Sequence, residues 1–315
     1  MDTRPNLSAI RAAHARIRPF IHRTPVLTCS ALDALVGASL FFKCENFQKV
    51  GAFKIRGATN AVLSLTDEEA SRGVATHSSG NHAAALALAA RNRGIAAHVV
   101  MPRNAPGIKV DAVRGYGGRI TFCEPDQASR EAKVADVIRE TGASLIHPYD
   151  DDRIIAGQGT AALELLEDVP DLDAVLAPVG GGGLLSGTAI AVKSLLPKTR
   201  VVGCEPALAD DAAASMREGR IVPARPPLTI ADGLRTSLSE RTYSIIRALV
   251  ESIAVVEEDE IRAALRLVLE RMKIVVEPSA VVPLAVMLNR DLDLKGKRVG
   301  IILSGGNVDV GNLPL

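Results

Sequence analysis

Short apolar runs rich in valine and isoleucine alternate with longer amphipathic segments along almost the whole chain. Short apolar runs bounded by turn residues are typical of buried strands, and the longer amphipathic segments of helices. A first helix is predicted from the spacing of Leu7, Ile10, Ala13 and Ile17. Nine strands are predicted, at residues 40–44, 74–76, 97–101, 119–122, 144–147, 174–178, 201–204, 253–256 and 299–303.

This alternation of strand and helix predicts an α/β fold with open, twisted, mostly parallel sheets and helices on both faces. The length of 315 residues favours two domains, since a domain typically has about 150 residues. Ligands of such folds bind beyond the carboxyl ends of the strands. Residues that directly follow the predicted strands are therefore the candidates for function.

The charges are balanced, with 37 Lys and Arg against 36 Asp and Glu, so the formal net charge is +1. Nucleic-acid binding draws on an excess of positive charge, and we expect no nucleic-acid partner. There is no run of about 18 apolar residues and no secretory signal, so we expect no membrane partner. The cysteines are widely spaced and favour a reducing cytoplasm: Cys29, Cys44, Cys123 and Cys204.

Four consecutive glycines follow the predicted strand at 174–178 and precede a predicted helix. Backbone N–H groups of such a turn can converge on a phosphate, and four glycines cost too much chain entropy for a casual turn. The dinucleotide fingerprint and the Walker loop do not fit, because Leu185, Ser186 and Thr188 stand where glycine or lysine is needed. We predict that a compact phosphate on a small cofactor binds at Gly180, Gly181, Gly182 and Gly183.

Two further places have both a chemical and a structural interpretation. Lys54 stands early in a predicted helix, where a partly dry pocket would lower its pKa and allow a Schiff base, although most lysines are solvated surface groups. Ser304 follows the predicted strand at 299–303, and its hydroxyl can bond a ring nitrogen or belong to a turn.

A polar segment follows the predicted strand at 74–76 and opens an alanine-rich helix. Its hydroxyl and backbone N–H donors at a helix N-terminus suit a carboxylate, and an ordinary serine N-cap is the alternative. The segment consists of Ser78, Ser79, Gly80, Asn81 and His82.

An acidic cluster follows the predicted strand at 201–204 and contains Glu205, Asp210 and Asp211. Carboxylates and backbone carbonyls are hard oxygen ligands, which suit Mg²⁺, Mn²⁺ or Ca²⁺. Capping of the next helix by acidic residues is the alternative. The histidines and cysteines have no zinc-type spacing.

Taken together, the segments GAFKIRGA, SSGNHA, GGGG, EPALADD and SGGN resemble the fold-type II pyridoxal-phosphate enzymes, which have a tryptophan synthase beta-like fold. Within that group they are similar to the serine racemase and serine/threonine dehydratase branch. The order and spacing of the motifs match from about residue 20 to residue 309. Two positions depart from many relatives, namely Ala52 in place of serine and Tyr149 in place of an asparagine found in animal racemases.

The resemblance implies how pyridoxal 5′-phosphate is held. Lys54 would form the Schiff base, Phe53 would pack beside it, and Asn81 would bond the 3′ oxygen of the cofactor. The glycine turn and the N–H of Leu184 would bind the phosphate. Ser304 would face the pyridine nitrogen, and a neutral hydroxyl there favours loss of a β-leaving group over transamination.

The resemblance also implies the substrate and metal sites. Ser79 would be a second acid/base opposite Lys54, and Arg130 and Glu277 would lie near the substrate and the cofactor. Ser78, Gly80 and His82 would belong to the loop that binds the substrate carboxylate. A divalent cation would be held by the side chains of Glu205 and Asp211 and the carbonyl of Ala209.

We therefore expect a lyase that converts L-serine and L-threonine to a 2-oxo acid and ammonia, with possible racemisation of serine. The alternatives are a 3-hydroxyaspartate ammonia-lyase, in which Arg130 could hold the second carboxylate, or a serine racemase as the main activity. A non-catalytic protein on the same fold would be expected to lack Lys54. The resemblance further implies a homodimer with a large domain (1–73 and 147–315) and a small inserted domain (74–146) that closes over the substrate.

Overall fold

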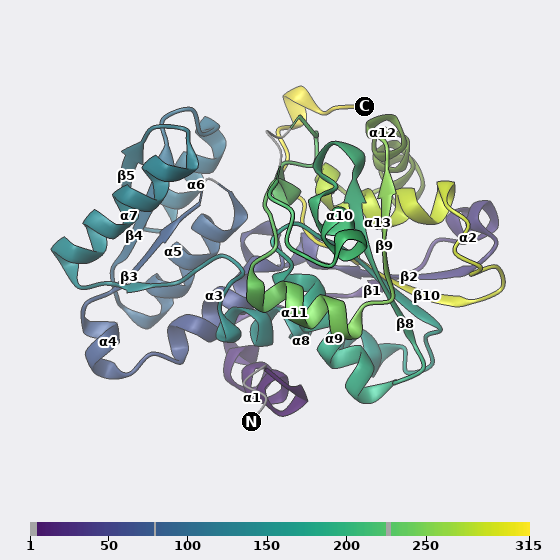
Figure 1. Cartoon of the computed structure of the whole chain (residues 1–315), viewed down its shortest axis with the longest axis horizontal. Coiled ribbons are helices and arrows are strands. Elements are labelled where there is room, and N and C mark those ends of the chain that lie inside the picture. The colour runs from purple at the N-terminus through teal and green to yellow at the C-terminus, as the bar shows by residue number, and fades with distance from the viewer. Residues whose placement is uncertain (1–4, 79, 225–227) are drawn as a thin grey trace.

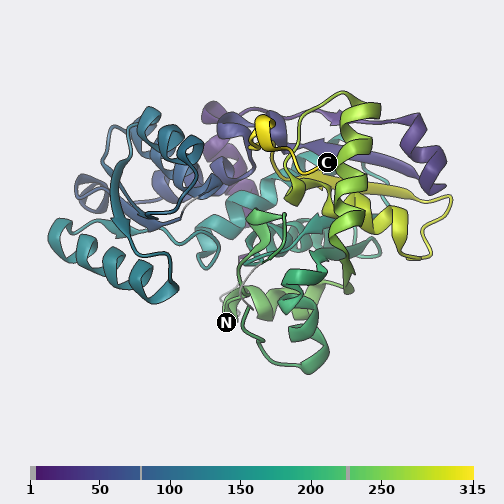
Figure 2. The ribbon, with the colours of Figure 1, turned by 90° about the horizontal axis from the view of Figure 1, so that it is seen from above.

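The strands form two separate sheets in two lobes of the molecule (Figure 1; seen from above in Figure 2). The structure is a computed structural model that describes residues 5–78, 80–224 and 228–315, apart from the side chain of Gln127. The larger sheet has the order β1-β2-β10-β7-β8-β9, and only β1 runs antiparallel to its neighbour. The smaller sheet is parallel throughout and has the order β5-β4-β3-β6.

The strands of the larger sheet are β1 (Val26–Leu27), β2 (Ser39–Cys44), β7 (Ala174–Pro178), β8 (Arg200–Pro206), β9 (Ser252–Val256) and β10 (Arg298–Leu303). Those of the smaller sheet are β3 (Val74–His77), β4 (Ala97–Pro102), β5 (Arg119–Cys123) and β6 (Ser144–Leu145). The helices are α1 (Leu7–Ile17), α2 (Ser30–Val36), α3 (Lys54–Leu63), α4 (Asp67–Ser71), α5 (Asn81–Arg93), α6 (Gly107–Gly115), α7 (Gln127–Thr141), α8 (Asp152–Asp168), α9 (Gly183–Leu195), α10 (Asp211–Glu218), α11 (Glu240–Leu249), α12 (Glu258–Leu267) and α13 (Pro278–Asn289).

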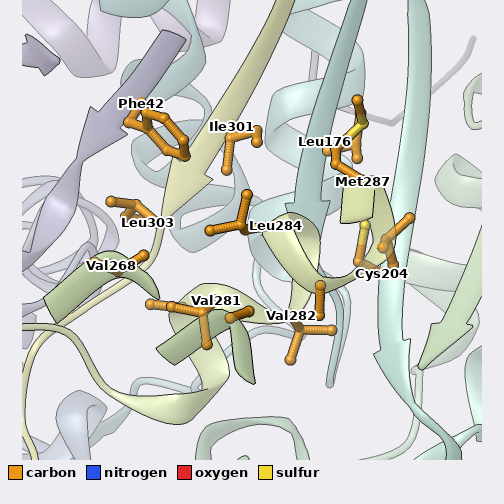
Figure 3. Packing of buried hydrophobic residues seen from close by; sticks show 14 of the residues in the cluster. Phe42, Leu176, Cys204, Val268, Val281, Val282, Leu284, Met287, Ile301 and Leu303 are labelled. Carbon is orange, nitrogen blue, oxygen red and sulfur yellow. The ribbon is translucent and has the colours of Figure 1, made fainter. Parts of the chain in front are cut away.

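Helices cover both faces of the larger sheet. Alternate strand residues point to opposite sides of the sheet, so each face has its own hydrophobic core. Leu176 and Ile301 share a core with α2, α12 and α13, whereas Val175 and Ile302 share one with α1, α8, α9 and α11. Figure 3 shows the first of these cores, in which Leu284 of α13 lies near the strand residues. The buried residues of both cores are fully buried or nearly so, and both faces therefore contribute to stability.

The smaller sheet is covered in the same way. Buried residues of α3, α5 and α6 share a core with Val74 and Met101, and α7 covers the other face beside Ala75 and Val100. Helix α3 precedes this sheet in the sequence yet shares a core with α5. It therefore lies at the junction between the two lobes.

Three helices approach one another so closely that their backbones touch. A Cβ on Gly157 of α8 would lie 2.6 Å from the Cα of Gly57 of α3. A Cβ on Gly187 of α9 would lie 2.5 Å from the backbone nitrogen of Gly159 of α8. Glycine is thus required where α3, α8 and α9 meet.

The observed fold confirms the predicted fold class, and each of the nine predicted strands is present. The short edge strand β1 was not predicted, because two residues give no readable alternation. Strand β6 ends at Leu145, before the predicted end at 147, since His147 accepts backbone N–H groups of Tyr149 and Asp150 in a turn. In the described part of the chain no helix has the length and apolar character needed to cross a membrane.

Candidate active site

A cleft of about 470 Å³ lies between the two lobes and gathers most of the predicted site residues. These are Phe53, Lys54, Ser78, Gly80, Asn81, His82, Arg130, Gly180, Gly181, Gly182, Gly183, Leu184, Glu277 and Ser304. They come from segments far apart in the sequence, from Phe53 near the N-terminus to Ser304 near the C-terminus. Ser79 lies outside the described residues. The acidic cluster at 205–211 does not line the described cleft.

Lys54 is the first residue of α3 and lies beside the carboxyl end of β10. The backbone N–H of Phe53 donates to the carbonyl of Ser304 at 3.0 Å, which joins the two segments. The Lys54 Nζ donates to the carbonyl of Pro148 at 2.9 Å and lies 5.1 Å from the centre of the Phe53 ring. Burial lowers the pKa of Lys54 to about 8, and Glu277 opposes this effect. A substantial fraction of the amine is therefore neutral and nucleophilic near pH 8.

The glycine turn has no room for side chains. A Cβ on Gly181 would lie 2.2 Å from the ring of Tyr149, and a Cβ on Gly180 would lie 3.0 Å from the Cα of Leu234. Helix α9 begins at Gly183, so its N-terminal N–H groups belong to the same turn. This is a cradle of backbone donors at the positive end of a helix dipole, and it fits a phosphate group.

A pair of polar side chains crosses the cleft between the lobes. The Asn81 Nδ2 donates to both carboxylate oxygens of Glu277, at 3.1 and 3.0 Å. Burial raises the pKa of Glu277 to about 7, and the hydrogen bond from Asn81 lowers it in part. The carboxyl group is thus half-protonated close to neutral pH.

His82 is buried and electrically neutral. Its Nε2 lies 3.1 Å from the carbonyl of Ile146, which makes Nε2 the protonated ring nitrogen. Burial lowers the pKa of His82 to about 3, and the charge of Lys54 adds to this effect. The imidazole therefore brings no positive charge to the loop at 78–82.

Arg130 of α7 lines the same cleft, on the side of the smaller sheet. Its Nε is buried, and among the described residues it has no hydrogen-bond partner. A buried guanidinium N–H without a partner is costly unless a ligand supplies one. Arg130 is therefore suited to bind an anionic group in the cleft.

The structure adds residues that sequence reasoning did not assign. Tyr149 was noted only as a departure from animal racemases, yet its ring packs on the glycine turn and stacks edge-on against His147 at 4.6 Å. Lys109 of α6 forms an ion pair with Asp232 across the cleft. Tyr149 follows a predicted strand and could have been found on that ground. Lys109 carries no signal of its own, since its partner is 123 residues away.

The acidic cluster forms a separate site at the end of β8. The carboxylate of Glu205 accepts the backbone N–H groups of Ala212 and Ala213, at 3.0 and 2.9 Å, so it caps α10. Its pKa lies well above the ordinary value because of burial, and the nearby charge of Asp211 raises it further. Two neighbouring buried carboxyl groups repel each other when both are ionised, and a cation between them would relieve this repulsion. In the described part of the chain, no group of three or more His, Cys, Asp or Glu residues is placed to hold a metal.

Comparison with known proteins decides the family. The sequence pattern of the family described as "Pyridoxal-phosphate dependent enzyme" matches residues 17–305. The chain belongs to this family. The expected family, the fold and the pyridoxal-phosphate cofactor are thereby confirmed.

Individual relatives cover almost the whole chain. A beta-hydroxyaspartate dehydratase of Paracoccus denitrificans (strain Pd 1222) is 53% identical over 310 residues, 98% of each chain. The structure of maize serine racemase matches with a TM-score of 0.96 and 49% identity, covering 98% of this chain and 95% of that one. The structure of the serine racemase from Dictyostelium discoideum matches with a TM-score of 0.93 and 49% identity, covering 97% and 99%. A threonine deaminase structure matches with a TM-score of 0.93 and 46% identity, also covering 97% and 99%.

Proposed function

We propose that this pyridoxal-phosphate dependent enzyme converts L-serine and L-threonine to the corresponding 2-oxo acid and ammonia, and that it also racemises serine. The observation that carries the proposal is the position of Lys54 in the same cleft as the glycine turn and Ser304, and burial there lowers the pKa of its amine to about 8. When bound, pyridoxal phosphate supplies an electron sink that stabilises negative charge at the substrate Cα.

The residues of the cleft would bind the cofactor and move the proton of the substrate. The turn from Gly180 to Gly183 would hold the phosphate, and the buried Ser304 would face the pyridine nitrogen. The neutral amine of Lys54 would remove the Cα proton of the substrate. The substrate loses its β-hydroxyl as one molecule of water, and one molecule of water is later consumed when the product is hydrolysed. Serine therefore gives pyruvate and ammonia, and no oxidant or reductant is needed.

Racemisation requires a proton from the opposite face. On the resemblance, Ser79 would deliver it, with Ser78, Gly80 and His82 near the substrate carboxylate. Because His82 is neutral, its contribution would come through its backbone N–H and through shape rather than charge. The ratio of elimination to racemisation would depend on whether the β-hydroxyl leaves before Ser79 protonates Cα.

A second candidate substrate is 3-hydroxyaspartate. The Nε of Arg130 favours it, because this buried donor has no acceptor among the described residues and a second carboxylate would supply one. The beta-hydroxyaspartate dehydratase at 53% identity points to the same substrate class.

One assay tests both candidates. Purified enzyme loaded with cofactor and Mg²⁺ is offered L-serine, L-threonine, D-serine and the isomers of 3-hydroxyaspartate separately, and 2-oxo acid release and product chirality are recorded. Fast release from L-serine and L-threonine supports the proposal, and D-serine as the main product would make racemisation the principal activity. Turnover of 3-hydroxyaspartate alone would replace the proposed substrate and leave the role of Lys54 standing.

The variant Arg130→Gln separates the two candidates further. If Arg130 binds a second carboxylate, the KM for 3-hydroxyaspartate should rise at least tenfold and that for L-serine less than threefold. Arg103→Gln is the matched control, since Arg103 is 68% exposed and pairs with Glu124 on the surface.

The proposal includes three features of the whole protein. A divalent cation (Mg²⁺, Mn²⁺ or Ca²⁺) would bind the side chains of Glu205 and Asp211 and the carbonyl of Ala209, and the burial of both carboxyl groups at one place supports this. The lobe built on the sheet between Val74 and Leu145 would be the domain that closes over the substrate. The active form would be a homodimer in the cytoplasm, and the four free cysteines are consistent with a reducing compartment.

A further inference from the structure

The carboxamide of Asn307 connects the segment before Lys54 to Asn81, which lines the cleft. Its Nδ2 donates to the carbonyl of Val50 at 2.7 Å and to the Oδ1 of Asn81 at 3.0 Å. Asn81 in turn donates through Nδ2 to both oxygens of Glu277. A continuous chain of hydrogen bonds thus runs from the Val50 backbone, just before the Lys54 segment, to Glu277 at the start of α13.

The contact with Val50 determines which groups donate and which accept along this series of hydrogen bonds. A backbone carbonyl only accepts, so the end of the Asn307 amide that faces it has to be the NH₂ group. Val50 has a φ of 58°, in the left-handed region that a β-branched residue rarely adopts. Gly51 leaves the room for this contact, since a Cβ there would lie 2.4 Å from the Oδ1 of Asn307. The strained turn therefore holds Asn307 in one orientation.

An asparagine amide needs such a constraint. Its two ends have nearly the same size, and a half-turn exchanges a donor for an acceptor, so only the partners decide which end faces a ligand. Glu277 alone does not decide this near pH 7, because a carboxylate accepts whereas a carboxylic acid can donate. The charged groups that act on Glu277 are Lys54, Lys109 and Asp232. Asn307 does not titrate and keeps its donor in place at every pH.

We propose that Asn307 is a positioning residue that holds Asn81 with its N–H end toward Glu277 and the cleft. The inference rests on the proposed function and on the role that the resemblance gives Asn81, a hydrogen bond to the 3′ oxygen of the bound cofactor. With Asn307 in place, Asn81 presents a donor to that oxygen. With Asn81 turned around, two oxygen atoms would face each other.

The test is the dissociation constant of pyridoxal phosphate from the apoenzyme, measured at pH 6 and pH 8.5 for wild type and Asn307→Ala. Without Asn307, the neutral acid of Glu277 lets Asn81 turn at low pH, whereas the carboxylate still holds its N–H end at high pH. The Kd ratio of variant to wild type should therefore be at least tenfold at pH 6 and threefold or less at pH 8.5. An equal ratio at both pH values, or a ratio below two at both, overturns the proposal.

Asn46→Ala is the matched control, because the Asn46 Nδ2 also donates to a backbone carbonyl, that of Val275, whereas among the described residues it is Asn307 that donates to Asn81. Its Kd should stay within twofold of wild type at both pH values. Thermal unfolding of each variant checks the fold.

Loss of Asn307 could also disturb the turn at Val50, so a second measurement tests whether Asn307 acts through Asn81. In an Asn81→Ala background, removal of Asn307 should change the Kd less than twofold, since Asn307 acts through Asn81. A further tenfold loss in that background overturns the proposal. Failure of the wild-type protein to bind pyridoxal phosphate would instead remove the proposed function. Binding without turnover would remove only the substrate assignment.

Discussion

The guanidinium of Arg56 donates to both carboxylate oxygens of Glu164, at 2.9 and 2.8 Å, and both side chains are buried. The same guanidinium binds both oxygens of Glu45, and the ammonium of Lys43 lies 2.7 Å from Glu164. Two positive and two negative charges thus neutralise one another in the interior. Since Arg56 lies two residues after Lys54 on α3, this cluster joins the start of that helix to α8.

Replacing Arg56 with Met should destabilise the protein strongly. The change leaves two buried carboxylates facing a single ammonium, and removal of one member of a buried ion pair costs about 3–5 kcal/mol. Urea unfolding of the purified variant measures the loss. Arg72→Met is the control, because Arg72 pairs with Glu68 on the surface and should lose far less. Equal losses in the two variants would contradict the importance of the buried cluster.

Attachment of pyridoxal phosphate to the apoenzyme should depend on the charge of Lys54. Only the neutral amine reacts, so the rate should rise with pH and level off above the lowered pKa of about 8. An ordinary lysine would continue to gain rate up to about pH 10.4. Stopped-flow absorbance between pH 6.5 and 10 follows the reaction. A rate that keeps rising tenfold per pH unit to pH 10 would show that Lys54 has an ordinary pKa.

Gly181→Ala should disrupt the phosphate cradle. The new methyl group would lie 2.2 Å from the Tyr149 ring, so either the ring or the turn has to move. We expect the Kd for pyridoxal phosphate to rise about 100-fold, the equivalent of roughly 2.8 kcal/mol. Gly115→Ala is the control, since none of the described atoms lies within 4 Å of a Cβ there. An unchanged Kd for Gly181→Ala would mean that the phosphate binds elsewhere.

Mg²⁺ should stabilise the wild-type protein against heat, and Glu205→Gln should abolish the effect. A cation at 100 times its Kd adds about 2.7 kcal/mol to the free energy of unfolding. The measurement is Tm with Mg²⁺ and with a chelator. Glu140→Gln, on the exposed side of α7, should respond to Mg²⁺ as wild type does. If Glu205→Gln kept the full response, the cation would bind at a different site.

The sequence alone predicted the parts of the molecule whose signal is local. The valine and isoleucine runs located the strands, and the four glycines after β7 located the tightest turn of the cleft. The contacts that shape the site could not be predicted from the sequence, because they join residues that are far apart along the chain. Arg56 looks like an ordinary helix residue until Glu45 and Glu164 are brought to it. The packing of Tyr149 on Gly181 likewise depends on the whole fold.

The backbone contacts at Gly57, Gly157 and Gly187 bear on how the cleft can open. Helix α3 begins with Lys54, and helix α9 begins at the glycine turn. Helix α8 packs between these two helices, and at the glycines its backbone contacts theirs directly. The distance from Lys54 to the glycine turn is therefore set by backbone contacts between helices rather than by side chains. In the proposed function the substrate amine takes the place of Lys54 on the cofactor, so the glycine turn would be the contact that retains the cofactor through its phosphate while an amino acid enters and a product leaves.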